Sequence, residues 1–323
     1  MSKFRWPLAC LGLALALVSC STQPPTGRAS PTSTAPASCR LPVVAAAKGQ
    51  GSGPLQAGFI TLPTSAFAPD PGAAGGSFYD RALQRWVAVA PPVLSADGLS
   101  YAYFDGGTKQ GNVELADLRS GTFRLLTSGG PWQVVGIGTG AVYLMQMEFV
   151  NSAAYGLVGI GRGLWQVPLS GGTPIRLTTD SLNWTWVDSR AVYAAGVTSD
   201  VAGGPNPVVR FDLGTGQVAT WFDRGARTRL LAVDASGAGL AIMEGADEEL
   251  WRIPVSGEPV KVWSGATDAI RPWGPVAVDG TDVWFSSSAS TPQWAIYHYS
   301  PQLGLRQVAL FSDHPVTVAG PCT

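Results

Sequence analysis

Short stretches in which apolar and polar residues alternate, separated by turns, run through the chain between residues 92 and 311. Such alternation is typical of half-buried β-strands. Five pairs of these stretches flank a glycine, which a hairpin turn needs because other side chains clash at positive φ. The pattern therefore predicts β-hairpins that turn at Gly121, Gly171, Gly216, Gly257 and Gly304.

A second set of predicted hairpins alternates with the first. It comprises the segments VLSADGLSYAYF, VVGIGTGAVYLM, TWVDSRAVYAA, LAVDASGAGLAIM and VAVDGTDVWFSS. The two sets together give four strands per repeat and a period of 41 to 50 residues between turn glycines, which is typical of β-propeller blades. A hairpin chain without this alternation would instead indicate a β-sandwich.

These repeats provide five blades, and a sixth has to be assembled from the two ends of the domain. The front contributes LPVVAAA, AGFITLP and the hairpin around SFYDRALQRWVAV, and the back contributes HPVTVAG. Pairing the first and last strands in one blade leaves no open sheet edge. We therefore expect an all-β, six-bladed β-propeller over residues 39–323, with five or seven blades if the front is divided differently.

The N-terminus has the features of a signal peptide over residues 1–19. Lys3 and Arg5 precede an apolar run from Leu8 to Val18 that is too short to span a bilayer. The run ends in Leu-Val-Ser-Cys, which resembles the lipobox of bacterial lipoproteins. The resemblance implies export, cleavage, lipidation of the Cys20 thiol and attachment to the cell envelope. The anchor would lie on the outer face of the cytoplasmic membrane or, in an envelope with two membranes, hold the protein in the periplasm or at the outer membrane. The alternative is an ordinary secretory signal followed by a chance cysteine.

Residues 20–38 form a predicted linker, because they are rich in Pro, Ser, Thr and Ala and have no bulky apolar residue to bury. Cys10 leaves with the signal peptide and Cys20 carries the lipid, so Cys39 and Cys322 remain as a pair in an oxidising compartment. We expect a disulfide between them that joins the ends of the propeller domain.

One segment carries a family resemblance. LSADGLSYAYF is similar to the Ser-Pro-Asp-Gly strand-turn-strand motif of TolB-like propellers, with Ala96 in place of the proline, and VAVDGTDVWF is a weaker copy. The resemblance covers the blades and implies a propeller fold of the TolB type.

Composition disfavours several functions. The chain has no run rich in Lys and Arg, and 13% of its residues are charged, so we do not expect nucleic acid as a partner. His298 and His314 are its only histidines, and no Gly-x-Ser-x-Gly, P-loop, EF-hand or His-Glu-x-x-His motif is present. We predict structural or surface roles for both histidines and no metal or cofactor. The acidic residues of segment 244–249 are predicted to form a solvated turn.

Tryptophan is the enrichment that suggests a binding site. Trp165 and Trp251 recur in Leu-Trp-x-x-Pro and indicate a repeated packing position between blades. Three other tryptophans precede strands that would line the propeller channel, beside polar and charged residues, and the long segments 146–163 and 197–206 would rise from the same face. The predicted ligand-binding residues are Trp132, Asp180, Asn183, Trp184, Arg227, Asp268, Arg271 and Trp273. The alternative for each tryptophan is burial between blades.

The leading functional hypothesis is a non-enzymatic, membrane-anchored propeller that binds a small molecule, a glycan, a peptide or an envelope protein. A second hypothesis is a secreted hydrolase or lyase that uses two carboxylates facing each other across the channel. A third is a structural module of an envelope assembly, with protein partners on the sides of the blades.

Overall fold

Strands that follow one another along the chain pair in antiparallel sheets, most of them four-stranded. The computed structural model describes residues 38–46, 55–73, 78–88, 93–106, 110–152, 156–197, 205–245, 247–266, 270–288, 293–312 and 314–323. The predicted signal peptide, Cys20 and nearly all of the linker lie outside these ranges. The described strands belong to one compact unit, Pro36–Thr323.

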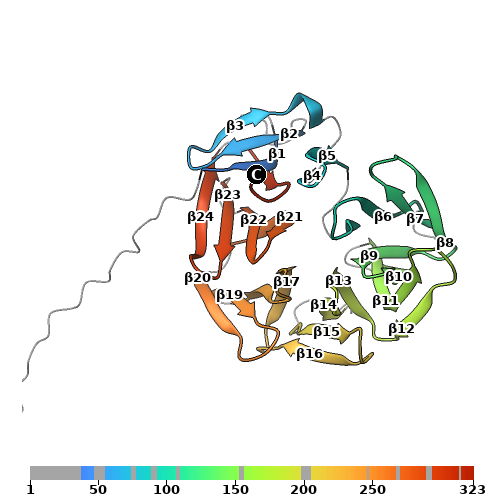
Figure 1. The fold of residues 1–323 in the computed structure, drawn as a ribbon. Helices are drawn as coiled ribbons and strands as arrows, with labels where there is room; N and C mark the ends of the chain where they lie inside the picture. The colour runs from blue at the N-terminus through green and yellow to red at the C-terminus, as the bar shows by residue number, and fades with distance from the viewer. Residues whose placement is uncertain are drawn as a thin grey trace, which may run out of the picture. The chain divides into compact units, whose positions relative to one another are not determined.

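Four sheets repeat the same order, in which each strand pairs with the next one along the chain (Figure 1). The first contains β9 (Trp132–Gly138), β10 (Ala141–Ser152), β11 (Gly156–Pro168) and β12 (Ile175–Thr178). The second contains β13 (Leu182–Val187), β14 (Ala191–Val197), β15 (Val208–Asp212) and β16 (Val218–Phe222). The third contains β17 (Arg227–Val233), β18 (Gly239–Glu244), β19 (Asp247–Ile253) and β20 (Val260–Ala266). The fourth contains β21 (Pro272–Asp279), β22 (Asp282–Ser288), β23 (Trp294–Ser300) and β24 (Gly304–Phe311).

The sheet that precedes these four has three strands, β6 (Ser100–Phe104), β7 (Asn112–Asp117) and β8 (Phe123–Ser128). Leu94 forms a single antiparallel bridge with Tyr101 of β6. It occupies the position beside β6 where the other sheets have their first strand. Residues 89–92, just before this bridge, lie outside the described part of the chain.

Both ends of the domain contribute strands to one sheet, as the sequence predicts. Its order is β25 (Val316–Val318), β1 (Arg40–Ala46), β2 (Leu55–Thr61) and β3 (Ala66–Pro69). The prediction is wrong for one strand pair: the hairpin around SFYDRALQRWVAV forms a separate two-stranded sheet, β4 (Phe78–Asp80) and β5 (Arg85–Val87). The preceding strand β3 already pairs with the outer edge of β2, so the hairpin finds no free edge there.

The β4–β5 hairpin connects the terminal sheet to the β6–β8 sheet. Tyr79 N donates to Ala319 O at 2.6 Å, and Trp86 Nε1 donates to Asp70 Oδ2 at 3.0 Å beside the 3-10 helix η1 (Pro71–Ala73). On its other side, the Arg85 guanidinium donates to Leu118 O, just after β7. Hydrogen bonds to the terminal sheet and to the β6–β8 sheet therefore hold the hairpin between them.

The glycines that define the repeat have the predicted backbone conformation. Gly121, Gly171, Gly216, Gly257 and Gly304 have φ of 68°, 86°, 71°, 96° and 69°. In the four-stranded sheets, each glycine lies where the chain turns from the third strand into the fourth, and Gly121 lies at the corresponding turn from β7 into β8. Alternation and turn glycines were thus sufficient to locate these hairpins.

The apolar faces of successive sheets pack against each other and form the core. Trp165 contacts Trp132 edge to face, with ring centroids 5.6 Å apart, in a cluster that includes Val113 and Leu126 of the preceding sheet. Trp251 contacts Phe222 of the preceding sheet at 5.5 Å. The repeated Leu-Trp-x-x-Pro motif therefore marks a packing position between sheets, as predicted.

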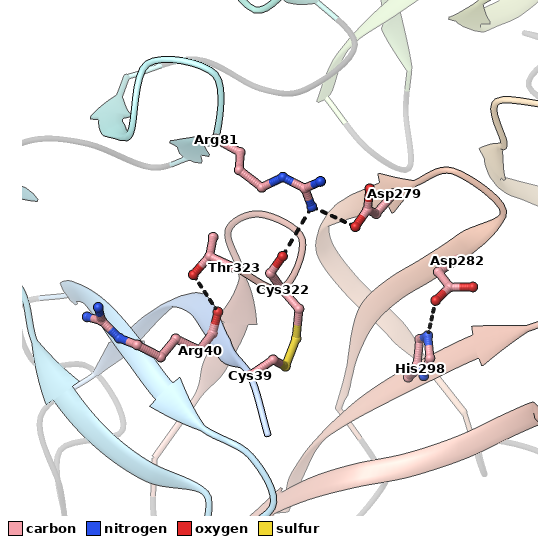
Figure 2. Close-up of a disulfide and its surroundings, with 8 residues drawn as sticks. All are labelled: Cys39, Arg40, Arg81, Asp279, Asp282, His298, Cys322 and Thr323. Atoms are coloured by element: carbon pink, nitrogen blue, oxygen red, sulfur yellow. Dashed lines mark hydrogen bonds and ion pairs between the residues drawn. A yellow bond between two sulfur atoms is a disulfide. The ribbon is translucent and has the colours of Figure 1, made fainter. Parts of the chain in front are cut away.

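Cys39 and Cys322 form the predicted disulfide, with their Cα atoms 5.7 Å apart (Figure 2). Cys39 immediately precedes β1, and Cys322 follows β25 by a few residues. The bond therefore joins the two chain segments that share the terminal sheet. In the described part of the chain, no helix is long and apolar enough to cross a membrane.

Candidate functional site

The first strands of four successive sheets, β9, β13, β17 and β21, lie side by side nearest the centre of the arrangement in Figure 1, and we call them the inner strands. The turns that follow them are neighbours too. Arg190 Nη2 donates to Ser236 O at 2.8 Å, and Ala235 N donates to Gly280 O at 2.9 Å. Because these turns meet at one end, the first residues of the inner strands gather at the opposite end.

Exposed side chains mark the first residues of the inner strands. Successive residues of a strand point to opposite sides, so exposed and buried positions alternate there. The buried members pack between sheets and are Trp132, Trp184, Thr228 and Leu230. The exposed members form the group that we call the rim: Gln133, Asn183, Arg227, Arg229 and Trp273.

Two arginines on β17 supply the positive charge of the rim. Arg227 Nε lies 3.4 Å from Glu244 Oε2 on the adjacent strand. Arg229 Nη2 donates to Pro272 O of the next inner strand at 2.8 Å. Partial removal from water lowers the pKa of Arg229, while Glu244 opposes that shift, so the guanidinium remains charged at neutral pH. Arg229 thus holds two inner strands together and presents its charge at the rim.

A threonine hydroxyl on the same strand as Asn183 has an unused hydrogen-bonding capacity. Thr185 Oγ1 is buried and has no hydrogen-bond partner among the described residues. A buried hydroxyl normally has a partner, because losing its bonds to water costs about 1–3 kcal/mol. This unsatisfied hydroxyl lies two residues after Asn183 in β13, below the accessible surface of the rim.

A cavity of about 570 Å³ lies next to the rim, between the β6–β8 and β9–β12 sheets. Gln133 belongs both to the rim and to the lining of this cavity. The rest of the lining is mainly apolar and aromatic, and includes Phe104, Trp132, Met147 and Phe149. The rim therefore combines polar and charged groups with an adjoining apolar surface, a common composition of ligand sites.

Two of the tryptophans predicted to bind ligand are buried in the core, although Trp132 also lines the cavity beside the rim. Trp184 is 0% exposed and packs edge to face against Phe211, with ring centroids 6.4 Å apart. Trp132 is 8% exposed and donates through Nε1 to Gly129 O. Each occupies the buried position of an inner strand, one residue from the exposed rim position. Trp273 is 44% exposed and stays at the rim.

The remaining predicted residues are only partly brought together. Asn183 and Arg227 are rim residues. Asp180 is exposed before β13, where its Oδ2 accepts a hydrogen bond from Thr178 Oγ1 at 2.7 Å. Arg271 is exposed immediately before β21, and its backbone N donates to Ser287 Oγ at 2.8 Å. Asp268 lies outside the described residues.

The expectation of a long loop over 146–163 is wrong for most of that segment. β10 and β11 extend through it as a long hairpin, paired from Met147–Gly161 to Ser152–Gly156 after a bulge. Alternating apolar residues continue to Val150 and from Leu157, which favours strand over loop. Most of segment 197–206 lies outside the described residues.

Acidic segment 244–249 is structural rather than a solvated turn. Glu248 is buried in β19, where its Oε2 accepts the backbone N–H of Ile270 at 2.8 Å. Glu249 binds Lys261 Nζ at 2.9 Å, and this contact lowers the pKa of its carboxyl group. Among the described residues of the four inner strands, Asp279 is the one carboxylate, and Arg81 binds it at 2.6 Å. The facing carboxylate pair required by the enzymatic hypothesis is thus not formed by these strands.

His298 has a packing role, as predicted. Its ring stacks on Trp284 with centroids 3.9 Å apart, and its Nε2 lies 3.1 Å from Asp282 Oδ2 (Figure 2). Burial lowers the pKa of this histidine below its ordinary value, although Asp282 opposes the shift. His314 contacts the Phe311 ring edge to face at 5.4 Å. Within the described ranges, no three His, Cys, Asp or Glu side chains are grouped so that they could hold a metal ion.

Sequence reasoning missed Gln133, Arg229, Thr185 and, apart from Trp132, the aromatic lining of the cavity. The alternation of polar residues with Trp132, Trp184 and Thr228 is the signal that could have identified three of these positions. Trp132 and Trp184 were predicted as ligand-binding residues because of their residue type, whereas their position in the alternation indicates burial. The cavity lining comes from two sheets, and no local pattern relates Phe104 to Phe149.

Comparison with known proteins identifies the fold. TolB from Acinetobacter baumannii superimposes with a TM-score of 0.52 at 15% sequence identity, covering 88% of this chain and 67% of that one. A putative TolB from Agrobacterium tumefaciens gives a TM-score of 0.49 at 13% identity, covering 88% and 93%. An oligogalacturonate lyase in complex with manganese gives 0.46 at 17% identity, covering 85% and 74%. The sequence matches no protein-family model and no curated protein. The chain has a TolB-like propeller fold, and at these identities the likeness concerns the fold alone.

Proposed function

We propose that this protein is a ligand-binding propeller of the cell envelope whose ligand contacts the rim of the inner strands. The observation that carries the proposal is the gathering of five exposed side chains at the starts of four successive inner strands. Exposed residues of a folded scaffold at a point where its strands converge are a usual place for recognition.

The rim chemistry favours a polar ligand without a strong net charge, such as a segment of a glycan or a peptide. Trp273 offers an exposed indole face on which a sugar ring or a planar side chain can stack. Asn183 and Gln133 offer both hydrogen-bond donors and acceptors. Glu244 neutralises much of the charge of Arg227, and Arg229 remains to bind an oxygen acceptor.

The binding experiment compares two exposed aromatic residues. Intrinsic tryptophan fluorescence of the full chain is titrated with envelope glycan fragments and with peptides. Trp273→Ala is expected to weaken binding at least tenfold, because the stacking surface is lost. Phe123→Ala is the matched control, since Phe123 is 59% exposed but lies on the outer strand β8. Equal affinity of Trp273→Ala and the unsubstituted protein would show that the rim is not the site.

The proposal places the propeller outside the cytoplasmic membrane, held by lipid on Cys20 and separated from the membrane by the linker 20–38. The lipobox-like Leu-Val-Ser-Cys ending supports this anchor. Intact mass analysis of the protein purified from membranes tests it. A lipid-sized mass increase on a chain that begins at Cys20 is expected, and Cys20→Ser should abolish both the increase and membrane retention.

We assign six blades to the propeller. The five four-stranded sheets and the β6–β8 sheet, completed by the Leu94–Tyr101 bridge, support this number. The β4–β5 hairpin then belongs to the connection between the terminal blade and the next one. An experimental structure with β4–β5 as part of a further four-stranded sheet would change the count to seven.

A further inference from the structure

A second cavity, of about 440 Å³, lies at the other end of the inner strands from the rim. Its walls come from the β4–β5 hairpin, the Ser95–Gly98 turn, the end of β21 and Pro321. Two Asp-Gly turns therefore meet here: Asp97-Gly98 comes from the motif that resembles TolB-like propellers, and Asp279 belongs to its weaker copy. The volume lies in the range of small-molecule sites.

A buried carboxylate of this cavity has an oxygen without a partner. Asp80 is 3% exposed, and its Oδ1 accepts the backbone N–H groups of Ala82 at 2.8 Å and Leu83 at 3.1 Å. Its Oδ2 has no hydrogen-bond partner in the described part of the chain. The carboxylate faces Gly98, another residue of the cavity wall: a Cβ built there would lie 2.8 Å from Oδ2. An unpaired buried carboxylate oxygen is costly unless a donor or a cation binds it.

The charges in the cavity wall favour a cation. The lining contains three carboxylates, Asp80, Asp97 and Asp279, and one guanidinium, Arg81, which gives a formal charge of −2. Arg81 is already used, since it binds Asp279 Oδ2 at 2.6 Å and Cys322 O at 3.2 Å (Figure 2). The Ser95 hydroxyl and the Leu99 N–H bind Asp97 and lower the pKa of its carboxyl, so it is ionised at neutral pH.

The arrangement fits an organic cation better than a metal ion. These three carboxylates are not close enough together to form a metal-binding group, within the residues that the structure describes. An ammonium or guanidinium group needs only one buried carboxylate oxygen and tolerates a second charge several ångströms away.

We propose that this cavity binds the ammonium or guanidinium group of an organic cation, with Asp80 as the principal contact and Asp97 as the second charge. The ligand is either a small free amine or a lysine or arginine side chain of a peptide. Because the cavity and the rim lie at opposite ends of the inner strands, this site is independent of the proposed rim site.

Isothermal titration calorimetry on the full chain tests the proposal with N-acetyl-arginine amide, agmatine and a pentapeptide with a central arginine. N-acetyl-citrulline amide has nearly the same shape without the charge and should not bind measurably. Stronger binding of agmatine would identify a free amine as the ligand, and stronger binding of the pentapeptide would identify a side chain. The absence of binding by all three cations at millimolar concentration would overturn the proposal.

Substitutions that are expected to weaken binding, and one that is expected to strengthen it, separate an effect on binding from an effect on folding. Asp80→Asn retains an oxygen for the Ala82 and Leu83 N–H groups and should weaken binding of the cation at least tenfold. Arg81→Gln removes the competing positive charge and should strengthen it several-fold. Asp97→Asn is a second test that does not alter the hairpin, and we expect a smaller but measurable loss of affinity for the cation.

Asp212→Asn is the matched control. Asp212 Oδ1 caps an exposed turn in the same way, at 3.0 Å from Gly214 N, and its substitution should leave binding of the cation unchanged. Unaltered binding in Asp80→Asn and Asp97→Asn would refute the assignment.

Discussion

Arg40 and Thr323 are joined by two backbone hydrogen bonds, from Arg40 N to Thr323 O at 3.2 Å and from Thr323 N to Arg40 O at 2.9 Å. The Thr323 hydroxyl also donates to Arg40 O at 3.1 Å (Figure 2). Next to this contact, the disulfide links residues 283 positions apart, and β25 pairs with β1 from Val43–Val318 to Ala45–Val316. The terminal sheet is thus held by covalent, backbone and side-chain bonds at one place.

Removal of the disulfide should lower the free energy of unfolding. In the chain-entropy model a loop of this length contributes on the order of 5 kcal/mol, which is an upper value. We expect Cys39→Ser/Cys322→Ser to unfold at a clearly lower denaturant concentration, and a reductant to bring the unsubstituted protein to the same midpoint. The reductant should not affect the double variant. Coincident unfolding curves of the oxidised protein and the double variant would contradict this role.

Two tryptophans of the inner strands should differ strongly in their effect on stability. Trp184→Ala removes a 0% exposed side chain from the core, and we expect a loss of about 3–5 kcal/mol. Trp273→Ala removes a side chain that is 44% exposed, and the loss should stay within about 1 kcal/mol. Urea unfolding followed by circular dichroism measures both. Similar losses for the two variants would mean that Trp273 is also part of the core.

Two Asp-Gly turns provide a test of the contact between Gly98 and Asp80. Gly98 and Gly280 have φ of 70° and 60°, so alanine is disfavoured at both for the same backbone reason. A Cβ at Gly98 would also press on the Asp80 carboxylate at 2.8 Å, whereas a Cβ at Gly280 meets no atom within 4 Å. Gly98→Ala should therefore lower the thermal midpoint more than Gly280→Ala does. The reverse order would place Asp80 elsewhere.

His298 should make the protein less stable in mild acid. Burial lowers its pKa below the ordinary value of 6.5, so the unfolded chain binds the proton more readily than the folded one. The His298 proton therefore does not reduce the free energy of unfolding above about pH 6.5. As the pH falls through 6.5 toward the pKa of the folded state, the free energy of unfolding decreases. Carboxyl groups with lowered pKa values, such as that of Asp97, contribute only at lower pH.

Denaturant unfolding at several values between pH 7.5 and pH 5 measures this dependence. His298→Gln should be less stable than the unsubstituted protein at pH 7.5, because the stacking on Trp284 is weakened, but its stability should change less with pH. A variant with the full pH dependence of the unsubstituted protein would assign the effect to other groups.

Prediction from sequence succeeded for the repeated hairpins, whose determinants are local, and for the terminal sheet, which closes the ring. The turn glycines follow from the need for positive φ, and the paired terminal strands follow from leftover strand segments together with two cysteines. The role of the β4–β5 hairpin could not be predicted in this way. Its neighbours, Ala319 and Leu118, are far from it in the chain, so only the folded arrangement determines which sheet edge it meets.

In the candidate sites, too, some features follow from local sequence pattern and others depend on tertiary packing. Period-two alternation and the regular repeat are enough to place Asn183, Arg227 and Trp273 at the starts of inner strands. The same alternation also marks Trp184 as a buried position and Arg229 as an exposed one. It could not show that the Arg229 guanidinium donates to Pro272 O of the next inner strand, because that contact depends on how two sheets lie side by side. The cavity beside Asp80 was decided by tertiary structure alone. Its carboxylates come from three separate segments, and their mutual distance depends on how the hairpin packs against the ends of two sheets.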